Sequence, residues 1–404
     1  MRRSIMEADP MGKSGKKDST GTIGRTLDVL RQKQWFNLLV FFLSIYIFII
    51  GIKLMGGGFK GLGRDFAEDL VETTSNPLVG LCIGVFVTAL VQSSSATTSM
   101  VVLLVLNDPS FFPNAIPIVI GANIGTSVTN VIVSLGHIRH PPSFRRAFAG
   151  ALVHDFFNIL AAALLFPTEW LVRILTGKGI LERLGEGTAT LLMGNKGVEF
   201  DTLDLILDPV LGPMERGIDA IGFHPEILTL VVGLIILFTA LTFITRSARR
   251  AIEGRVQKVV DRVLFKNAAT SFGFGVTLTS FVQSSSVTTS LVVPLVGSGI
   301  LTVEKIFPYT LGANIGTTVT ALMAALAAQI PTEGGKMAIA ISLVHLYFNI
   351  IGIALLYPFR KVPIYLAKKA AKFFSMHRKW TIVFILVLFF GVTGSVILID
   401  RFLF

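Results

Sequence analysis

The sequence predicts an all-α polytopic membrane protein with two inverted-topology repeats, each containing a re-entrant hairpin and an unwound transmembrane helix, plus one extra C-terminal helix. Three observations carry this prediction. Hydrophobic residues make up 52% of the 404-residue chain and charged residues only 15%. Apolar runs of about 20 residues recur, which is the length needed to cross a bilayer. One polar octet occurs twice. This composition excludes an ordinary soluble domain.

Nine apolar segments alternate with polar connections. They cover residues 35–55, 79–106, 114–135, 146–167, 226–246, 270–297, 305–328, 337–358 and 380–402. The first 34 residues contain eight Lys or Arg and four Asp or Glu without apolar periodicity. We expect them to form a cytoplasmic tail, because this stretch is too long and too mixed in charge for the start of a signal peptide.

An internal repeat runs through the chain at a fixed offset of 191 residues. The octet Gln-Ser-Ser-Ser-Ala-Thr-Thr-Ser at 92–99 returns as Gln-Ser-Ser-Ser-Val-Thr-Thr-Ser at 283–290. The stretch Gly-Ala-Asn-Ile-Gly-Thr at 121–126 returns at 312–317. The same offset relates His154 to His345 and Asn158 to Asn349. The pattern indicates a duplicated membrane unit.

Loop charge predicts the orientation of the two repeats, because short loops rich in Lys and Arg stay in the cytoplasm. The tail and residues 136–146, 246–268 and 359–379 are basic, whereas 168–225 holds nine acidic and five basic residues. A full crossing at every apolar segment cannot satisfy this pattern. It is satisfied if 79–106 and 270–297 are re-entrant hairpins, and the two repeats are then inverted.

The predicted organisation follows from these assignments. It comprises a cytoplasmic tail (1–34), a first membrane repeat (35–167), an extracytoplasmic connector (168–225), a second inverted repeat (226–358), a basic cytoplasmic segment (359–379) and a C-terminal transmembrane helix (380–404). The single cysteine, Cys82, and the absence of Asn-x-Ser/Thr triplets give no basis for a disulfide-tied or glycosylated exterior domain. We therefore expect a multi-pass protein of a bacterial inner (plasma) membrane with a cytoplasmic N-terminus.

The net charge of +11 lies in loops, since residues 65–138 and 267–304 contain no Lys or Arg. We expect these basic loops to set the topology and to contact membrane lipids. Their distribution does not resemble the footprint of a phosphate backbone, so no nucleic-acid partner is expected.

The two polar octets lie in the middle of the predicted hairpins. Unpaired polar groups at membrane depth cost several kcal/mol, so they persist only beside protein or a water-filled cavity. Ser and Thr can also simply allow helices to pack closely, but two inverted copies favour a binding site. Hydroxyl, amide and carbonyl oxygens suit sodium, while hydroxyl protons and half-helix N-termini suit an oxyanion. The octets therefore predict sodium and an anion bound side by side, which is the basis of symport.

The repeated Gly-Ala-Asn-Ile-Gly-Thr stretch has two interpretations. Its glycines could form a close helix-packing face, as a Gly-x-x-x-Gly motif does. Alternatively, the helix could unwind there and free its carbonyls, since glycine weakens a helix and Asn and Thr residues lie within one turn. We expect the unwound helix, opposite each hairpin tip.

Asp155 is the one carboxylate clearly inside a predicted span, and its repeat mate is Leu346. Such a group is costly unless it meets a cation or water, so it marks a functional site, with a structural hydrogen bond to Arg or His as the alternative. His154 and His345 share a helix face with Asn158 and Asn349. For these histidines a structural hydrogen bond is expected rather than a proton relay.

The chain resembles the type II sodium-dependent phosphate cotransporter family over about residues 75–360. The resemblance is carried by the paired Gln-Ser-Ser-Ser motifs, the Gly-Ala-Asn-Ile-Gly-Thr stretch after each, and Phe-Arg-Arg-Ala-Phe-Ala-Gly-Ala-Leu-Val-His-Asp at 144–155. It implies a secondary active symporter that couples inward sodium flow to uptake of inorganic phosphate by alternating access. It also implies electrogenic transport, because electrogenic members have Asp at the position of Asp155 and electroneutral members have Gly.

The family likeness also assigns residues to the two substrates. The implied phosphate site is lined by Gln92, Ser93, Ser94, Ser95, Gln283, Ser284, Ser285 and Ser286. Thr317 and Thr320 would join Gln283 and Ser284 at a sodium. With the polar residues of the expected unwound helices and Asp155, the expected sodium ligands are Gln283, Ser284, Thr317, Thr320, Asn314, Asp155, Asn123 and Thr126.

Three other functions stay open from the sequence. They are symport of another oxyanion or a dicarboxylate, a membrane-embedded hydrolase, and a channel. The chain lacks a Gly-x-Ser-x-Gly elbow and a His-Glu-x-x-His motif, so we expect neither an enzyme nor a cofactor beyond co-transported sodium. The oligomeric state is left open.

Overall fold

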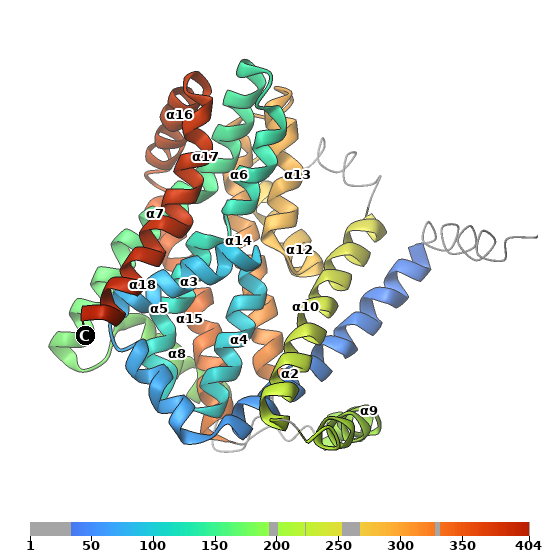
Figure 1. Ribbon diagram of the computed structural model, residues 1–404. Coiled ribbons are helices and arrows are strands. Elements are labelled where there is room, and N and C mark those ends of the chain that lie inside the picture. Colours follow the sequence, from blue (N-terminus) through green and yellow to red (C-terminus); the bar gives the residue numbers. More distant parts are fainter. Residues whose placement is uncertain (1–33, 194–200, 223, 253–266, 328–331, 404) are drawn as a thin grey trace, which may run out of the picture.

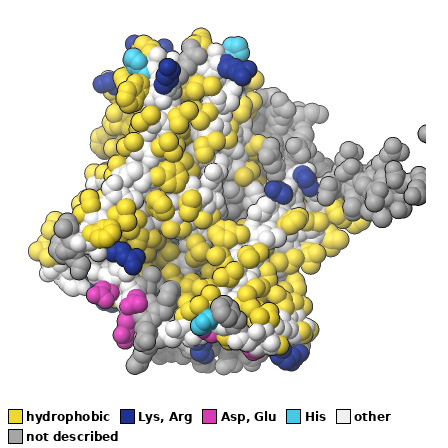
Figure 2. All heavy atoms as spheres, viewed as in Figure 1, with side chains coloured by type: hydrophobic (Ala, Val, Ile, Leu, Met, Phe, Trp, Pro, Cys, Tyr) yellow, Lys and Arg dark blue, Asp and Glu magenta, His cyan; other side chains and the backbone are white. Residues whose placement is uncertain are grey.

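The computed structural model describes residues 34–193, 201–222, 224–252, 267–327 and 332–403, and every element assigned in these ranges is helical (Figure 1). Nearly all of the predicted tail at 1–34 lies outside the described residues. Seven helical segments are long and apolar enough to cross a membrane: Trp35–Gly63, Pro109–His137, Pro141–Thr176, Pro225–Ser247, Val303–Ala327, Glu333–Leu356 and Lys379–Phe402. Hydrophobic side chains cover most of the face in Figure 2, and Lys, Arg and His gather at its upper end. A multi-pass α-helical membrane protein is therefore confirmed.

The helices of the first half follow one another along the chain. They are α2 (Gln34–Thr73), α3 (Pro77–Val91), α4 (Ser94–Asn107), α5 (Phe112–Gly125), α6 (Val128–Ser134) and α7 (Pro141–Thr176), followed by α8 (Ile180–Met193) and α9 (Asp201–Asp219) in the connector. The second half contains α10 (Pro225–Ile252), α12 (Ala268–Val282), α13 (Ser285–Gly297), α14 (Val303–Ala327) and α15 (Glu333–Leu356). The chain ends with α16 (Lys361–Met376), α17 (Arg378–Leu386) and α18 (Val392–Leu403).

The 191-residue offset reappears in the helix boundaries. α3 and α12 correspond residue for residue, and α4 and α13 begin at equivalent serines. The packing is equivalent too, because α3 lies on α5 as α12 lies on α14. Each half also contacts the other in the same way: α4 packs on α14 and α15, and α13 packs on α6 and α7. α2 and α10 pack against each other beside this core (Figure 1).

Each predicted hairpin segment consists of two short helices that break at the Gln-Ser step. Gln92 and Gln283 adopt left-handed backbone angles, with φ of 58° and 59°, which end the preceding helix. Ser93 and Ser284 then cap the next helix by accepting hydrogen bonds from the amides of Ala96 and Val287. A left-handed non-glycine residue costs about 1–2 kcal/mol, so the surrounding contacts must hold each break in place.

Paired threonines supply one such contact in each pair of helices. The Thr88 hydroxyl donates to Thr97 Oγ1 at 3.0 Å, linking α3 to α4. The hydroxyls of Thr279 and Thr288 lie 2.8 Å apart and link α12 to α13 in the same way. All four side chains are buried. The two arms of each pair are therefore joined one helical turn below the break.

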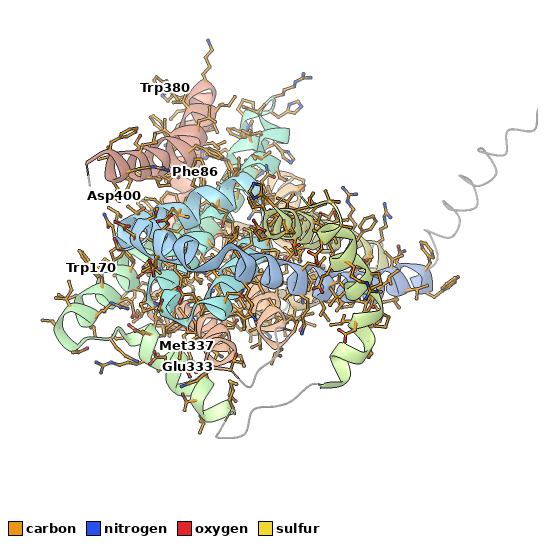
Figure 3. The ribbon with its side chains drawn as sticks, turned by 60° about the horizontal axis from the view of Figure 1, so that its bottom comes forward. Phe86, Trp170, Glu333, Met337, Trp380 and Asp400 are labelled. Atoms are coloured by element: carbon orange, nitrogen blue, oxygen red, sulfur yellow. The ribbon has the colours of Figure 1, made fainter. Side chains whose placement is uncertain are left out.

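The extra C-terminal helix packs against the first of these helix pairs. Phe86 of α3 meets Phe390 edge to face, with ring centroids 5.8 Å apart. At the N-cap of α3, Asn76 Nδ2 donates to Asp400 Oδ1 at 2.7 Å. Figure 3 shows Phe86 and Asp400 on this side of the molecule. α18 has no counterpart on α12 among the repeat-related helices, so it makes the two halves unequal.

Several helices extend beyond the predicted segments or were not predicted. α2 continues to Thr73 and α7 continues through Pro167 to Thr176. The connector contains α8 and α9, and the basic segment forms α16. These three helices are amphipathic, so they show no long apolar run. α8 packs on α15, and α16 packs on α7.

The expected unwound helix is wrong for α14, which runs from Val303 to Ala327 without a break. In the first half, Thr126 and Ser127 separate α5 from α6, but both keep right-handed helical angles. The glycines serve helix packing instead. A methyl group on Gly121 would overlap the carbonyl of Leu81, and one on Gly312 would overlap the carbonyl of Phe272. The close-packing interpretation of the glycine stretch is the one that fits.

The close approach of α12 and α14 gives the first prediction. Gly275→Ala places a methyl group against the backbone carbonyl of Tyr309, so we expect the free energy of unfolding to fall by about 1–3 kcal/mol. Gly273→Ala on the same helix is the control, since nothing lies within 4 Å of the added methyl group. Thermal unfolding in detergent measures both variants. Equal stability of the two would contradict the packing role.

Candidate binding site

The breaks of the two helix pairs meet inside the protein. Ser95, in the first turn of α4, donates its hydroxyl to the backbone carbonyl of Gln283 at 3.0 Å. Ser95 and Gln283 are both buried, at 3% and 5% exposure. This contact crosses 188 positions of sequence and brings the N-terminus of α4 to the start of α13. The two copies of the Gln-Ser-Ser-Ser motif therefore share one polar region.

The two glutamines have different surroundings although their backbones match. Gln283 Oε1 accepts a hydrogen bond from Thr320 Oγ1 at 2.6 Å, and its amide nitrogen donates to the carbonyl of Ser280. Gln92 is exposed. Thr129, the repeat mate of Thr320, is half-buried, and its buried hydroxyl oxygen has no hydrogen-bond partner among the described residues. Gln283 is thus fixed on α14, while Gln92 is accessible.

The first half contacts the second break through the end of α5. Ser286 of α13 donates to the carbonyl of Thr126 at 3.3 Å, and Thr289 donates to Asn130 Oδ1 at 2.9 Å. Asn130 Nδ2 in turn lies 3.3 Å from His154 Nδ1. At the short interruption between α5 and α6, the carbonyl of Thr126 therefore has a side-chain partner from the other half.

A buried network of histidine and asparagine side chains also joins the two halves. His154 Nε2 lies 2.5 Å from Asn314 Oδ1, and Asn314 Nδ2 donates to Asn158 Oδ1 at 2.7 Å. The repeat-related contact joins His345 Nε2 to Asn123 Oδ1 at 3.4 Å. Each histidine thus bonds an asparagine of the other half. The expected structural hydrogen bonds of the histidines are consistent with this geometry.

The second half of this network is incompletely paired. Nδ1 of His345, Oδ1 of Asn349 and Nδ2 of Asn123 are buried and have no hydrogen-bond partner among the described residues. Ala321 occupies the position equivalent to Asn130, so His345 lacks the partner that His154 has. The repeated framework therefore does not produce equal chemistry in the two halves.

Asp155 lies in the middle of α7 with 2% exposure. Neither carboxylate oxygen has a hydrogen-bond partner within the described part of the chain, and no described Lys or Arg forms an ion pair with it. Ser127, at the interruption between α5 and α6, lies beside it. The structural alternative of an Arg or His partner is therefore not supported. A carboxylate in this setting needs a cation or water.

The structure connects some of the predicted site residues and leaves others apart. Ser95, Ser286, Gln283, Thr320 and Thr126 are connected around the meeting point of the breaks. Asn314 and Asn123 belong to the histidine network, while Thr317 bonds the carbonyl of Ala313 in its own helix. Ser94 and Ser285 are buried in the first turns of α4 and α13, and Ser93 and Ser284 cap those helices. Gln92 and Asp155 have no hydrogen bond to the other predicted residues.

Sequence reasoning missed two kinds of residue at this site. Asn130 accepts a hydrogen bond from Thr289, and Ser127 lies beside Asp155, but both residues stand outside the repeated motifs. Asn130 was recognisable as an amide inside an apolar segment with alanine as its repeat mate. Thr88 and Thr279 obey the 191-residue offset and precede each octet, so a search for further conserved-offset polar pairs finds them.

The chemistry of the site is that of neutral oxygen donors and oriented amides. Hydroxyl, carboxamide and carbonyl oxygens surround the breaks, and the positive ends of the α4 and α13 dipoles point into the same region. No group of three or more His, Cys, Asp or Glu suited to a resident metal occurs among the described residues. Such an arrangement can hold a small hard cation beside an oxyanion.

Comparison with known proteins agrees with this chemistry. The family model described as Na+/Pi-cotransporter matches residues 47–181 and 236–392. A sodium-dependent phosphate transport protein 2A of Ovis aries is 33% identical over 415 residues, covering 85% of this chain and 65% of its own length. A sodium-dependent phosphate transport protein 2B of Homo sapiens is 32% identical, with coverage of 86% and 62%. The chain thus spans just under two thirds of these relatives. No solved structure matches it.

The histidine network gives the second prediction. Asn314→Leu leaves His154 Nε2 and Asn158 Oδ1 without their amide partner, so we expect the free energy of unfolding to fall by about 2–4 kcal/mol. Ser99→Ala is the matched control, because the buried Ser99 hydroxyl has no partner in the described ranges. Unfolding in detergent without sodium or phosphate measures stability alone. A variant Asn314→Leu as stable as Ser99→Ala would rule out a structural role for the network.

Proposed function

Because the chain belongs to the Na+/Pi-cotransporter family, we propose that it is a secondary active symporter that couples inward sodium flow to uptake of inorganic phosphate. The family is one of transporters and not of enzymes. The observation that carries the proposal is the contact between Ser95 and the carbonyl of Gln283, which brings both motif copies to one buried polar region. The phosphate site lies between the two breaks.

Coupling follows from the neutrality of this region. Residues 65–138 and 267–304 contain no Lys or Arg, so no cationic side chain on either helix pair can balance a bound phosphate. Helix N-termini and hydroxyls stabilise part of the anionic charge, and sodium ions stabilise the rest. Each substrate therefore raises the affinity for the other, by the reciprocity of linked binding. The oxygen ligands for sodium include Gln283 and Thr320, which already touch.

The two helix pairs act as re-entrant hairpins of inverted repeats. α13 ends at Gly297, whose carbonyl accepts hydrogen bonds from Ser143 and Arg146 at the start of α7. α4 ends next to the start of α15, where a methyl group on Gly334 would overlap the carbonyl of Leu106. The second arm of each helix pair thus ends beside the start of a helix of the other half. α13 ends beside α7, and α4 ends beside α15. In Figure 1, α13 lies in the upper part of the molecule and α4 in the lower part, which supports entry from opposite sides.

Alternating access would then expose the shared site to one side at a time. The buried Gln283 and the exposed Gln92 support a state in which the two hairpin tips are unequally accessible. Movement of the helices of one repeat against those of the other changes which hairpin tip, at Gln92 or at Gln283, is covered. The crossed histidine and asparagine contacts lie between the two halves. They would have to rearrange or move as one body during this change.

Asp155 supplies a further sodium ligand and makes transport electrogenic. Its carboxylate is buried and unpaired among described residues, so a cation beside it removes a large energetic cost. Leu346 stands at the equivalent position, so the second half has no carboxylate there. A divalent phosphate entering with enough sodium ions then carries net positive charge into the cell.

Orientation gives the third prediction. In a Cys82→Ala background, a cysteine replacing His140 should be labelled by an impermeant thiol reagent only from the cytoplasm, and one replacing Thr190 only from outside. His140 lies in the basic loop before α7 and Thr190 lies in the α8 segment of the acidic connector. Labelling of both from one side would remove the hairpin assignment of the first repeat.

Sodium coupling gives the fourth prediction. In proteoliposomes, radiolabelled phosphate should accumulate only with an inward sodium gradient. Thr320→Val removes the hydroxyl bonded to Gln283, so the sodium concentration for half-maximal uptake should rise about fivefold. This factor corresponds to the loss of about 1 kcal/mol of binding free energy for one hydrogen bond. Thr277→Val is the control, because that exposed hydroxyl bonds only Gly273 of its own helix. Equal accumulation in potassium or choline medium would overturn the symport proposal.

The role of Asp155 gives the fifth prediction. Asp155→Gly deletes a sodium ligand and one negative charge, so phosphate uptake should persist while its response to an imposed membrane potential falls toward zero. Asp155→Asn tests the structural alternative, since it retains side-chain volume without the charge and should behave like the glycine variant. Current and isotope uptake are measured on the same proteoliposomes. A folded Asp155→Gly protein with the parental voltage response would exclude the assignment.

A further inference from the structure

A cavity of about 410 Å³ lies at the end of the molecule where α7 and α14 begin. Its wall includes Arg145 and Arg146 of α7, Glu304 of α14 and Lys368 of α16. Three elements that are distant in sequence therefore converge on it. The cavity is separate from the breaks at Gln92 and Gln283, and neither motif contributes to its lining. Figure 2 shows Lys, Arg and His side chains gathered at the upper end of the molecule, where α16 lies in Figure 1.

Two of the three cations in this cavity are already engaged. Arg146 donates from Nε and Nη2 to the carbonyl of Gly297, at 3.0 and 2.8 Å, and so caps the C-terminus of α13. Lys368 forms an ion pair with Glu304. Arg145 is exposed to the cavity and has no hydrogen bond or ion pair with any described residue. The cavity therefore has an excess of positive charge and one guanidinium free to bind.

The internal repeat provides a comparison for this arrangement. At the equivalent place in the other half, Met337 replaces Arg146 and Asp108 replaces Gly299. Lys336 replaces Arg145, and it pairs with Glu333 at 3.7 Å. Figure 3 shows Glu333 and Met337 together at the start of α15. Because the same backbone framework carries net acidic charge there, the basic cavity is a property of these side chains and not of the duplicated fold.

We propose that this cavity binds a phosphate oxyanion at the membrane boundary, either the headgroup of an anionic phospholipid or free inorganic phosphate. The planar guanidinium of Arg145 presents paired donors that match phosphate oxygens. The volume is that of a small-ligand pocket. α16 supports a boundary position, because this amphipathic helix exposes Tyr365 and Phe373 beside its lysines. Binding would join α7, α14 and α16 without touching the transport site.

Protection of Arg145 from phenylglyoxal tests the proposal on the unaltered full-length chain. The protein is placed in phosphatidylcholine nanodiscs in sodium-free chloride buffer, and the rate of arginine modification is followed by peptide mass spectrometry. One arm adds phosphatidylglycerol to the nanodiscs, and the other adds inorganic phosphate. Arg139, exposed in the same basic loop but outside the cavity lining, is the internal control.

We expect either additive to slow modification of Arg145 about tenfold, the effect of one strong charge-assisted contact, and to leave Arg139 unchanged. Protection by phosphatidylglycerol alone identifies a lipid headgroup, and protection by phosphate alone identifies the free anion. Protection by neither, or equal protection of Arg139, overturns the proposal. The absence of sodium keeps this result independent of phosphate transport.

Two variants give a second measure of the same site. Glu304→Gln frees Lys368 from its ion pair. The additive that protects Arg145, phosphatidylglycerol or inorganic phosphate, should therefore bind several-fold more tightly. Lys336→Gln removes a cation at the equivalent place in the other half and should leave the affinity unchanged. An unaltered affinity in Glu304→Gln would show that the charges of this cavity do not contribute to binding. A loss of affinity in Lys336→Gln would show that binding depends on overall charge. Either outcome would contradict a defined site.

Discussion

The structure depends on stabilising two polar helix breaks inside a membrane protein. Each break leaves amides and carbonyls that would cost several kcal/mol in hydrocarbon if they were unpaired. At the break in the second half, the backbone carbonyl of Gln283 accepts a hydrogen bond from Ser95 of the first half. This requirement explains why the halves are packed with α4 against α14 and with α13 against α6 and α7. A chain with one repeat would have no partner for its break.

Close helix packing is the second part of the same solution. Gly84, Gly121 and Gly125 let α3 approach α5 until backbone atoms touch, and Gly275, Gly312 and Gly316 do the same for α12 and α14. This approach fixes the direction of each short helix, and the threonine pairs fix its partner. The left-handed glutamines can then persist because the two flanking helices cannot straighten into one. The glycines therefore support the breaks through close helix contacts and do not create breaks of their own.

The sequence predicted the parts of the fold that depend on repetition and apolar length. The 191-residue offset gave the equivalence of α3 with α12 and of α4 with α13, and the octets marked where those segments divide. It did not predict that α14 stays continuous, because glycine, Asn and Thr suit both an unwound helix and a packed one. The distinction depends on which atoms lie opposite Gly312, and these come from Phe272, forty residues away. α8, α9 and α16 escaped prediction because amphipathic helices carry no long apolar run.

At the candidate site, the sequence identified the residue types but not their pairing. The contact between Ser95 and Gln283, and those between His154 and Asn314 and between Ser286 and Thr126, each join different halves. No local pattern specifies such long-range partners. Asn130 was missed because it breaks the repeat, and its mate is Ala321. A search confined to matching motifs finds the shared framework and overlooks the residues that distinguish the halves.

The residues without a repeat mate of the same type make the two halves chemically different. A duplicated framework alone would offer two equivalent sites. Two equivalent sites would not place an unpaired charge in one half and not in the other. Asp155 with Leu346 as its mate places one carboxylate on one side of the pseudo-symmetric core, and α18 packs on α3 of the first helix pair. The crossed histidine contacts are likewise unequal, at 2.5 Å and 3.4 Å. Repetition therefore supplies the stable polar breaks, while departures from it determine how the two halves differ in side-chain chemistry.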